Sequence, residues 1–515
     1  MNGAQAMIRT LVDSGVDVCF MNPGTSEMHF VHALDSVPEM RGVLALFEGV
    51  ATGAADGYAR MADRPAAVLL HLGPGLGNGL ANLHNARRAK VPVVNVVGDH
   101  ATYHAKYDAP LQSDIISIAR GVSSWVRTVA SPETIARDTA DAVAASYGAP
   151  GQVATLIVPA DTCWLDSPGP VGPSPVSGAG TVPSDRIDDI AAVLRAGEPA
   201  GLLVGGTAMR TAALHDAARV GMATGAKVLS ETFPTRAERG AGTPAVERLA
   251  YLAEFAQMQL QGLRHLVLVD AAHPVSFFAY PDKASDLVAE GCHVHVLSGP
   301  DEDAAGALAA LAAALDAPSD PPLIPAGRPA RPTGELNAES MANALGALLP
   351  QGAVVADEGN TTGLFAQGAT AGCPPHDWLT LTGGAIGFGL PTATGAAVAV
   401  PGRKVICLEA DGSAMYTAQS LWTQVREGLD VTTIILNNGS YAVLNMELSR
   451  VGAGDPGPRA LSMLDIPGLD FVALAASMGV PATRATTAEE FTAQLEAAIA
   501  VDGPALVEAV VPRTI

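Results

Sequence analysis

Two polar side chains near the C-terminal end of the chain carry the residue types of a metal site. Asp411 follows the apolar run Lys404–Leu408, and Asn438 follows the apolar run Thr432–Leu436. Such runs predict parallel strands, and parallel sheets bind their ligands in the crevice at the carboxyl ends of the strands. Carboxylate and amide oxygens are hard ligands that suit Mg²⁺. We therefore expect a magnesium site where these two strands end.

The small residues beside these side chains are suited to a diphosphate. Gly412 and Gly439 would let backbone N–H groups approach phosphate oxygens. The helix expected after Ser413 would direct its N-terminal dipole at the same group. The pattern therefore indicates a metal ion that holds a diphosphate.

The two motifs, D-G-S and N-N-G, resemble the signature of the thiamine diphosphate-dependent enzymes, in which G-D-G is followed by N-N. Ala410 stands where that family usually has Gly, which crowds the turn slightly. The alternative is a pair of turns that end in Asp and Asn by chance. The resemblance implies Mg²⁺ ligands at Asp411, Asn438 and the backbone carbonyl of Ser440, and cofactor contacts at Gly412, Ser413, Gly439 and Tyr441.

Two further segments resemble motifs of the same family. ADEGNTT resembles its diphosphate-contacting strand end, which implies contacts from Asn360 and Thr361. An N-cap of the next helix is an alternative role, compatible with the first. LTGGAIGFGLPTATG resembles G-G-x-x-G-F-x-L-P, in which a bulky residue, here Ile386, wedges the cofactor into a bent conformation and the Gly384 carbonyl meets the aminopyrimidine. On the residues alone, a place in the apolar core is preferred for Ile386.

An acidic residue in the N-terminal third matches the family's activating carboxylate. The segment ALFEGVATGAADGYARMAD resembles E-x-x-A-x-x-x-A-x-G-Y-A-R and places Glu48 at the start of a helix, with Arg60 further along it. An acid in a first helical turn is more often plain dipole complementation. The resemblance implies instead that Glu48 favours the imino tautomer of the aminopyrimidine, which then takes the proton from the thiazolium carbon.

The substrate side resembles benzoylformate decarboxylase and the acetolactate synthase large subunit. Ser26 and His71 fall on positions that resemble the decarboxylase's substrate-binding serine and proton-transferring histidine, although a histidine at a strand end is equally a structural residue. The segment Tyr107–Ile115 resembles the synthase and puts Gln112 in the active site. The segment His273–Lys283 lacks the decarboxylase's second histidine. The chain is therefore a mosaic of the two.

The elements that must position these residues form three α/β units. Short apolar runs alternate with helical patterns along the chain, as in doubly wound parallel sheets. Two Pro-rich stretches, Leu165–Pro183 and Ala317–Thr333, lack periodicity and read as linkers. We expect three doubly wound α/β domains of the thiamine diphosphate-dependent decarboxylase type: a pyrimidine-binding domain over residues 1–164, a central domain over 184–316 and a diphosphate- and Mg²⁺-binding domain over 334–515.

Composition excludes several classes of protein. Hydrophobic residues make up 48% of the 515 residues and charged residues 16%, which is typical of globular α/β proteins. The formal net charge of −22 would repel nucleic acid and anionic membranes, so neither is an expected partner. Five scattered cysteines, without C-x-x-C spacing or a leader segment, favour a soluble cytoplasmic protein.

The reaction that the resemblance implies is decarboxylation of a 2-oxo acid, after which the carbanion is protonated or joined to a second carbonyl compound. The family builds each active site between subunits, so we expect a homodimer or homotetramer. One alternative is an oxidase of the pyruvate oxidase type, whose FAD would need a site in the central domain, where no fingerprint is evident. Another is a non-catalytic cofactor-binding paralogue, against which the intact Glu48 and metal ligands argue.

One residue bears on the choice of substrate. Related enzymes place a bulky aromatic residue shortly after the metal motif, whereas this chain has Met446 and Glu447 there. A carboxylate facing the pocket would resist burial beside an aromatic ring; alternatively, Glu447 turns to solvent. In either case a stacking surface is lost, so we expect a small or polar 2-oxo acid to be preferred over benzoylformate.

Overall fold

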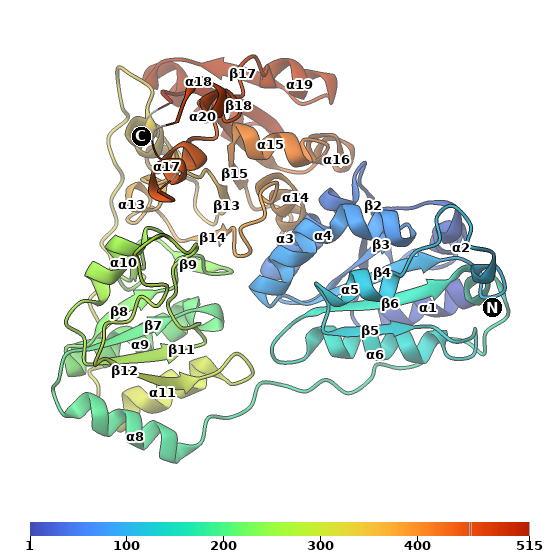
Figure 1. The fold of residues 1–515 in the computed structure, drawn as a ribbon, viewed down its shortest axis with the longest axis horizontal. Helices are drawn as coiled ribbons and strands as arrows, with labels where there is room; N and C mark the ends of the chain where they lie inside the picture. The colour runs from blue at the N-terminus through green and yellow to red at the C-terminus, as the bar shows by residue number, and fades with distance from the viewer. Residues whose placement is uncertain (453, 455, 514–515) are drawn as a thin grey trace.

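The computed structural model describes residues 1–452, 454 and 456–513 and folds them around three sheets (Figure 1). The N-terminal sheet lies to the right in that view, the central sheet at the lower left and the C-terminal sheet at the top. Every neighbouring strand pair is parallel except one, in the C-terminal sheet. The expected class of three α/β units with parallel sheets is therefore confirmed, whereas the limits of the domains stay a prediction.

The N-terminal sheet has six strands flanked by helices. Its order is β2 (Arg41–Leu44), β1 (Val18–Asn22), β3 (Ala66–Leu70), β4 (Val93–Asp99), β6 (Val153–Pro159) and β5 (Trp125–Thr128). Its helices are α1 (Gly3–Asp13), α2 (Met28–Ala33), α3 (Glu48–Ala62), α4 (Leu72–Ala89), α5 (Ile115–Arg120), α6 (Ile135–Tyr147) and α7 (Ala160–Trp164). Strand β5 was not predicted, because its side chains are only partly buried and give no apolar run.

The central sheet has five strands. Its order is β10 (Glu247–Arg248), β8 (Lys227–Ser230), β7 (Ala200–Val204), β11 (His265–Val269) and β12 (His293–Ser298). Its helices are α8 (Ser184–Arg195), α9 (Thr211–Thr224), α10 (Ala253–Leu260) and α11 (Ala304–Ala314). The chain reverses its direction of winding between β7 and β11, so the crevice of this sheet opens beyond their carboxyl ends.

The C-terminal sheet has seven strands, one of them supplied by the central part of the chain. Its order is β17 (Ala482–Ala485), β18 (Ala505–Val510), β16 (Val431–Asn437), β15 (Val405–Ala410), β13 (Val354–Glu358), β14 (His376–Thr380) and β9 (Ala237–Arg239). Strand β9 pairs antiparallel with β14, which the expectation of three separate segments missed. A strand of three residues without an apolar run is invisible in the sequence.

The helices of this unit flank the sheet and follow its strands. They are α12 (Ala338–Leu348), α13 (Ala366–Ala369), α14 (Gly389–Ala399), α15 (Asp411–Thr417), α16 (Ser420–Glu427), α17 (Ala442–Arg450), α18 (Pro458–Ser462), α19 (Phe471–Ser477) and α20 (Ala488–Ile499). Among the described residues, no helix combines the length and the apolar character that a membrane span requires.

Helices α3 and α14 join the N-terminal and C-terminal sheets into one continuous apolar core. Small residues let the two backbones touch. A Cβ on Gly57 would lie 2.1 Å from the carbonyl oxygen of Thr392, and one on Gly395 would lie 1.8 Å from that of Ala54. The Ala- and Gly-rich sequence of α3 is therefore a packing surface, and it fixes the helix that begins at Glu48.

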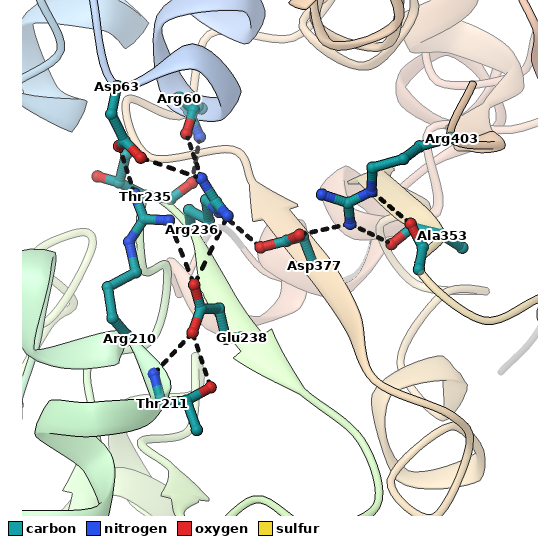
Figure 2. A network of polar contacts seen from close by, with 11 residues as sticks. Arg60, Asp63, Arg210, Thr211, Thr235, Arg236, Glu238, Ala353, Asp377 and Arg403 are labelled. Carbon is teal, nitrogen blue, oxygen red and sulfur yellow. Dashed lines mark hydrogen bonds and ion pairs between the residues drawn. The ribbon is translucent and has the colours of Figure 1, made fainter. Parts of the chain in front are cut away.

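A network of arginines ties the three units together (Figure 2). Arg60 of α3 forms a fully buried ion pair with Asp56 at 2.7 Å and donates to the carbonyl oxygens of Thr235 and Thr380. Arg236, from the central part of the chain, bonds Asp377 of β14 at 2.5 Å and the backbone carbonyl of Arg60 at 3.1 Å. The Arg60 guanidinium thus donates hydrogen bonds to backbone carbonyl groups of both other units.

We predict that Arg60→Met lowers the free energy of unfolding by about 3–5 kcal/mol, because it leaves the Asp56 carboxylate buried without its partner. Thermal unfolding measures the change. The matched control is Arg64→Met, since the Arg64–Asp17 pair at 3.0 Å is 39% and 41% exposed and its loss should cost less than about 1 kcal/mol. Equal shifts in the two variants would contradict the role given to Arg60.

Candidate active site

The expected metal ligands lie at the ends of two neighbouring strands. Strands β15 and β16 pair in parallel. Asp411 comes directly after β15, and Asn438 comes directly after β16. Asp411 is 2% exposed, and its carboxylate accepts the N–H groups of Gly412 at 2.8 Å and Gly439 at 2.7 Å. Burial raises the pKa of Asp411, while these backbone donors lower it. The strand-end arrangement predicted from the two motifs is present.

The helix after the first motif begins earlier than expected. Asp411, Gly412 and Ser413 are themselves the first turn of α15, where a helix dipole was expected only after Ser413. Ala410 precedes the helix with φ −75°, an ordinary value for any residue, so the missing family glycine causes no strain there. A ligand at this helix end would therefore meet the N–H groups of the motif itself.

The loop after β16 is held by its own turn and by a later segment. Asn438 Oδ1 accepts the N–H of Ser440 at 3.0 Å, and Ser440 Oγ accepts Asn445 Nδ2 at 2.8 Å. Tyr441 donates its N–H to the carbonyl oxygen of Leu464 at 2.8 Å. Gly439 adopts φ +65°, which favours glycine at this position of the loop.

A third strand end brings Asn360 and Thr361 to the same place. Asn360 Nδ2 donates to Ser413 Oγ at 3.3 Å, and Thr361 lines a small cavity with Asn438 and Arg513. Asn360 has φ +46°, a conformation that asparagine tolerates better than most residues. The alternative role as an N-cap is wrong, because the next helix, α13, begins at Ala366 after Phe365.

The donor set at the strand ends suits a metal-bound diphosphate. The oxygens that gather at the three strand ends are hard carboxylate, amide and hydroxyl groups, the kind that Mg²⁺ prefers. The ring of Tyr441 lies over Gly412, where an added Cβ would approach the ring to 2.4 Å. Glycine at 412 therefore keeps the backbone N–H groups close to the loop that carries Asn438.

The turn before α14 is held by helix α4 of the same chain. Asn82 Nδ2 donates to the carbonyl oxygen of Gly387 at 3.1 Å, and Asn85 Nδ2 donates to that of Ala385 at 2.8 Å. Gly384 is exposed with φ +75°, and Ile386 is partly exposed, so a place in the apolar core, preferred for Ile386 on the residues alone, is wrong. The Asn82 amide also donates to the carbonyl oxygen of Gly49 at 2.9 Å, which connects this turn to the residue after Glu48.

Glu48 is the first residue of α3 and is 8% exposed. Its Oε2 accepts Asn78 Nδ2 from α4 at 3.0 Å. Sequence reasoning missed Asn78, since its partner lies on another helix and no family motif marks it. A buried, singly hydrogen-bonded carboxylate retains lone pairs for a ligand.

His71 is paired with a buried glutamate that sequence reasoning missed. Its Nδ1 lies 2.8 Å from Glu27 Oε2, which also accepts the N–H of Gly24 at 2.8 Å. Glu27 is 2% exposed; burial raises its pKa, and His71 lowers it. Leu72, the next residue after His71, has φ +49°, a strained value for leucine. The sequence shows little sign of this pair: Glu27 is simply an acid next to Ser26, and its partner His71 lies 44 residues further along the chain.

Ser26 and Gln112 lie on loops that reach this same end of the N-terminal sheet. Ser26 belongs to the 3₁₀ turn Thr25–Glu27, just after Gly24, whose backbone packs directly against the His71 ring. Gln112 Oε1 is buried and has no hydrogen-bond partner among the described residues. The next residue, Ser113, packs against Gly73 at the start of α4. The structure thus places the turn that contains Ser26 against His71, through Gly24 and Glu27.

The expectation that Glu447 turns to solvent is wrong. It is 9% exposed, and its carboxylate is paired: it accepts the hydroxyl groups of Tyr280 at 2.7 Å and Tyr251 at 3.4 Å. Arg450, on the same helix, lies 3.5 Å from this carboxylate. The two tyrosines come from the central part of the chain, so no pattern within α17 could have revealed them.

Comparison with known proteins agrees with this geometry. Residues 1–119 match the model of the thiamine pyrophosphate enzyme N-terminal TPP binding domain, and residues 357–509 match that of the C-terminal TPP binding domain. The chain belongs to the thiamine pyrophosphate enzyme family.

Three individual proteins are similar to the chain over nearly its whole length. The chain is 62% identical, over the full length of both proteins, to a Mycobacterium tuberculosis protein with the provisional name acetolactate synthase large subunit IlvX. It is 30% identical to benzoylformate decarboxylase of Pseudomonas aeruginosa, with 96% of each chain covered. The solved structure of a thiamine diphosphate-dependent 4-hydroxybenzoylformate decarboxylase of Rhodococcus jostii shares the fold, with a TM-score of 0.87, 24% identity and 99% of each chain covered.

We predict that Glu447→Ala loosens α17 from the central part of the chain. The substitution leaves two tyrosine hydroxyls without their acceptor and leaves Arg450 paired with Glu254 alone, at a cost of about 1–3 kcal/mol. Hydrogen–deuterium exchange of residues 442–450 should accelerate, whereas the exposed Ser449→Ala on the same helix should leave it unchanged. Unaltered exchange in Glu447→Ala would show that the tyrosines do not hold the helix.

Proposed function

We propose that this protein is a thiamine diphosphate- and Mg²⁺-dependent enzyme that decarboxylates a 2-oxo acid and then protonates or carboligates the product. The observation that carries the proposal is the convergence of Asp411, Asn438 and Asn360 at three neighbouring strand ends of the C-terminal sheet. Membership of the thiamine pyrophosphate enzyme family supports the cofactor. The metal ion and the reaction are our inference from the donor set and from the relatives.

The residues of the C-terminal sheet would hold the cofactor. Asp411, Asn438 and the backbone carbonyl of Ser440 would bind Mg²⁺, and this ion would hold the diphosphate against the first turn of α15. The remaining contacts would come from the following residues: Asn360, Thr361, Gly384, Ile386, Gly412, Ser413, Gly439 and Tyr441. When bound, thiamine diphosphate supplies a carbon nucleophile and an electron sink for the bond that breaks as CO₂ leaves.

The residues of the N-terminal sheet would handle protons and substrate. Glu48 would accept a hydrogen bond from the aminopyrimidine, with Asn78 holding one of its carboxylate oxygens in place. Ser26 and Gln112 would bind the 2-oxo acid. His71 would move a proton at its Nε2, because Glu27 holds its Nδ1 at 2.8 Å.

The FAD-containing oxidase is disfavoured by carboxylates in the central crevice. The N–H of Gly206 bonds Glu231 at 3.1 Å, and that of Thr207 bonds Asp270 at 2.8 Å, where the winding of the sheet reverses. A nucleotide diphosphate there would meet two carboxylates and occupied backbone donors. A yellow colour of the purified protein would favour the oxidase. A non-catalytic paralogue would not need Glu48 and the proposed metal ligands in these positions, so their presence argues against that alternative.

Assembly and location remain part of the proposal. A homodimer or homotetramer with active sites between subunits follows from the family resemblance, and a cytoplasmic location follows from the composition. Large side chains around the candidate site, Met415 at 45% and Tyr416 at 51% exposure, offer an apolar surface for such contacts. Light scattering of the purified protein measures its mass in solution.

Incubation of the pure protein with thiamine diphosphate, Mg²⁺ and a panel of 2-oxo acids tests the reaction. We expect CO₂ release from at least one acid, with mass spectrometry showing an aldehyde or a ligated product. The expected preference for pyruvate or 2-oxobutanoate over benzoylformate rests only on the aromatic residue that this chain lacks after the metal motif, because the Glu447 carboxylate is already bonded to the Tyr280 hydroxyl. A benzoylformate kcat/KM well above the other two would contradict it, and no CO₂ from any acid would favour the paralogue.

We predict that Glu48→Gln keeps cofactor affinity within about tenfold and lowers turnover by orders of magnitude, because only the proton relay is lost. Proton–deuterium exchange at the thiazolium carbon of the bound cofactor measures the step directly. The exposed Glu39→Gln is the control. Exchange at the wild-type rate in Glu48→Gln would remove Glu48 from the mechanism.

We predict that Asp411→Ala abolishes binding of thiamine diphosphate with Mg²⁺, because the metal loses its anionic ligand. The loop loses its anchor as well, since Gly439 donates to the same carboxylate at 2.7 Å. Titration calorimetry should show no heat, whereas the exposed Asp502→Ala should bind as the wild type does. Undiminished affinity in Asp411→Ala would overturn the metal assignment.

A further inference from the structure

Two glutamates lie buried beneath the turn that precedes α14. Glu358 ends β13, and Glu409 stands beside it in register on β15. The two residues are 2% and 0% exposed, so both side chains lie in the interior between the sheet and the turn.

Glu358 is the member of the pair that meets backbone donors. Its Oε1 accepts the N–H of Gly387 at 2.9 Å, and its Oε2 accepts those of Phe388 and Gly389 at 2.7 Å each. These three donors stand at the N-terminus of α14, where a helix leaves its N–H groups without internal partners. Hydrogen bonds from backbone N–H groups to a carboxylate are strong, so Glu358 holds the start of α14 in place.

Little space remains around the pair. A Cβ on Gly389 would lie 2.2 Å from Glu409 Oε2 and 3.1 Å from the Cβ of Glu358. The backbone at the start of α14 therefore rests directly on both side chains. Glu409 has only the Cys407 thiol, at 3.6 Å, as a further partner, and its Oε1 accepts no hydrogen bond from the described residues.

The turn held by Glu358 is connected to Glu48. The carbonyl oxygen of Gly387 accepts Asn82 Nδ2 and Thr417 Oγ1, each at 3.1 Å. The Asn82 amide also donates to the carbonyl oxygen of Gly49 at 2.9 Å. A short series of hydrogen bonds thus runs from Glu358 through the peptide of Gly387 to the start of α3, where Glu48 stands.

We propose that Glu358 is a positioning residue for the cofactor: its carboxylate, which accepts three backbone N–H groups, fixes the turn that presents Gly384 and Ile386 to the aminopyrimidine. The inference rests on the proposed function, since that function assigns the two turn residues their contacts. It concerns the aminopyrimidine end alone. The diphosphate end is held by different residues, and this separation makes the role testable.

Binding of two ligands separates positioning from a general structural role. Mg²⁺ with thiamine diphosphate engages both ends of the site, whereas Mg²⁺ with inorganic diphosphate engages only the metal end. In Glu358→Gln, an amide N–H₂ faces backbone donors, so affinity for thiamine diphosphate should fall roughly thirtyfold. Affinity for Mg²⁺–diphosphate, measured by calorimetry, should stay within about threefold, because that end keeps all its contacts.

Two matched variants complete the test. Glu409→Gln alters the neighbouring buried carboxyl, which accepts none of these three N–H groups, and should bind both ligands as the wild type does. Glu231→Gln alters a partly buried carboxyl that accepts a backbone N–H in the central sheet, and it should also leave both affinities unchanged. Exchange of the amide hydrogens of residues 383–390 should accelerate only in Glu358→Gln.

The outcomes are distinct. Wild-type affinity for thiamine diphosphate in Glu358→Gln, or an equal loss for both ligands, would overturn the positioning role. Failure of the wild-type protein to bind thiamine diphosphate would overturn the proposed function itself, and the inference with it. If Glu358→Gln does not fold, Glu358→Asp is the substitute: it keeps the carboxylate, but its side chain is one methylene shorter and moves the carboxylate away from the three N–H groups. The same selective loss is then expected, and wild-type binding would refute the proposal.

Discussion

The burial of the Arg60 guanidinium is the constraint on which the rest of the structure depends. A fully buried cation must find acceptors for every donor, and Arg60 finds them on its own helix, on the central part of the chain and on the C-terminal sheet. The helix that carries it begins at Glu48 and lies in backbone contact with α14. Arg60 therefore fixes, through one helix, where Glu48 stands relative to the C-terminal sheet.

The C-terminal sheet concentrates its chemistry at the carboxyl ends of three adjacent strands. Strands β13, β15 and β16 end in or are followed by Glu358, Asp411 and Asn438. The two acids have different surroundings: Glu358 accepts the N–H groups at the start of α14, whereas Asp411 begins α15 and accepts the N–H of Gly439 from the loop after β16. Backbone N–H groups stabilise both charges in places that bulk water does not reach.

The central part of the chain contacts the C-terminal unit at two places. It supplies β9 to the C-terminal sheet, and the hydroxyl groups of Tyr251 and Tyr280 bond Glu447 of α17. In its own sheet, Glu231 and Asp270 accept the backbone N–H groups of Gly206 and Thr207 where the winding reverses. These contacts hold the central and C-terminal units in register.

Sequence alone determined which polar residues stand at the strand ends. Asp411, Asn438 and Glu48 stand in contiguous motifs, and local rules place such residues at the end of a strand or the start of a helix. The apolar runs likewise indicated most of the parallel strands, because buried strands leave a local signal. What tertiary structure decided were the partners that lie far apart along the chain: Glu27 with His71, Asn82 with Gly387, and Glu447 with two tyrosines. Whether a buried charge has a partner depends on how distant segments pack across the core, and no local sequence pattern shows which distant residues will meet.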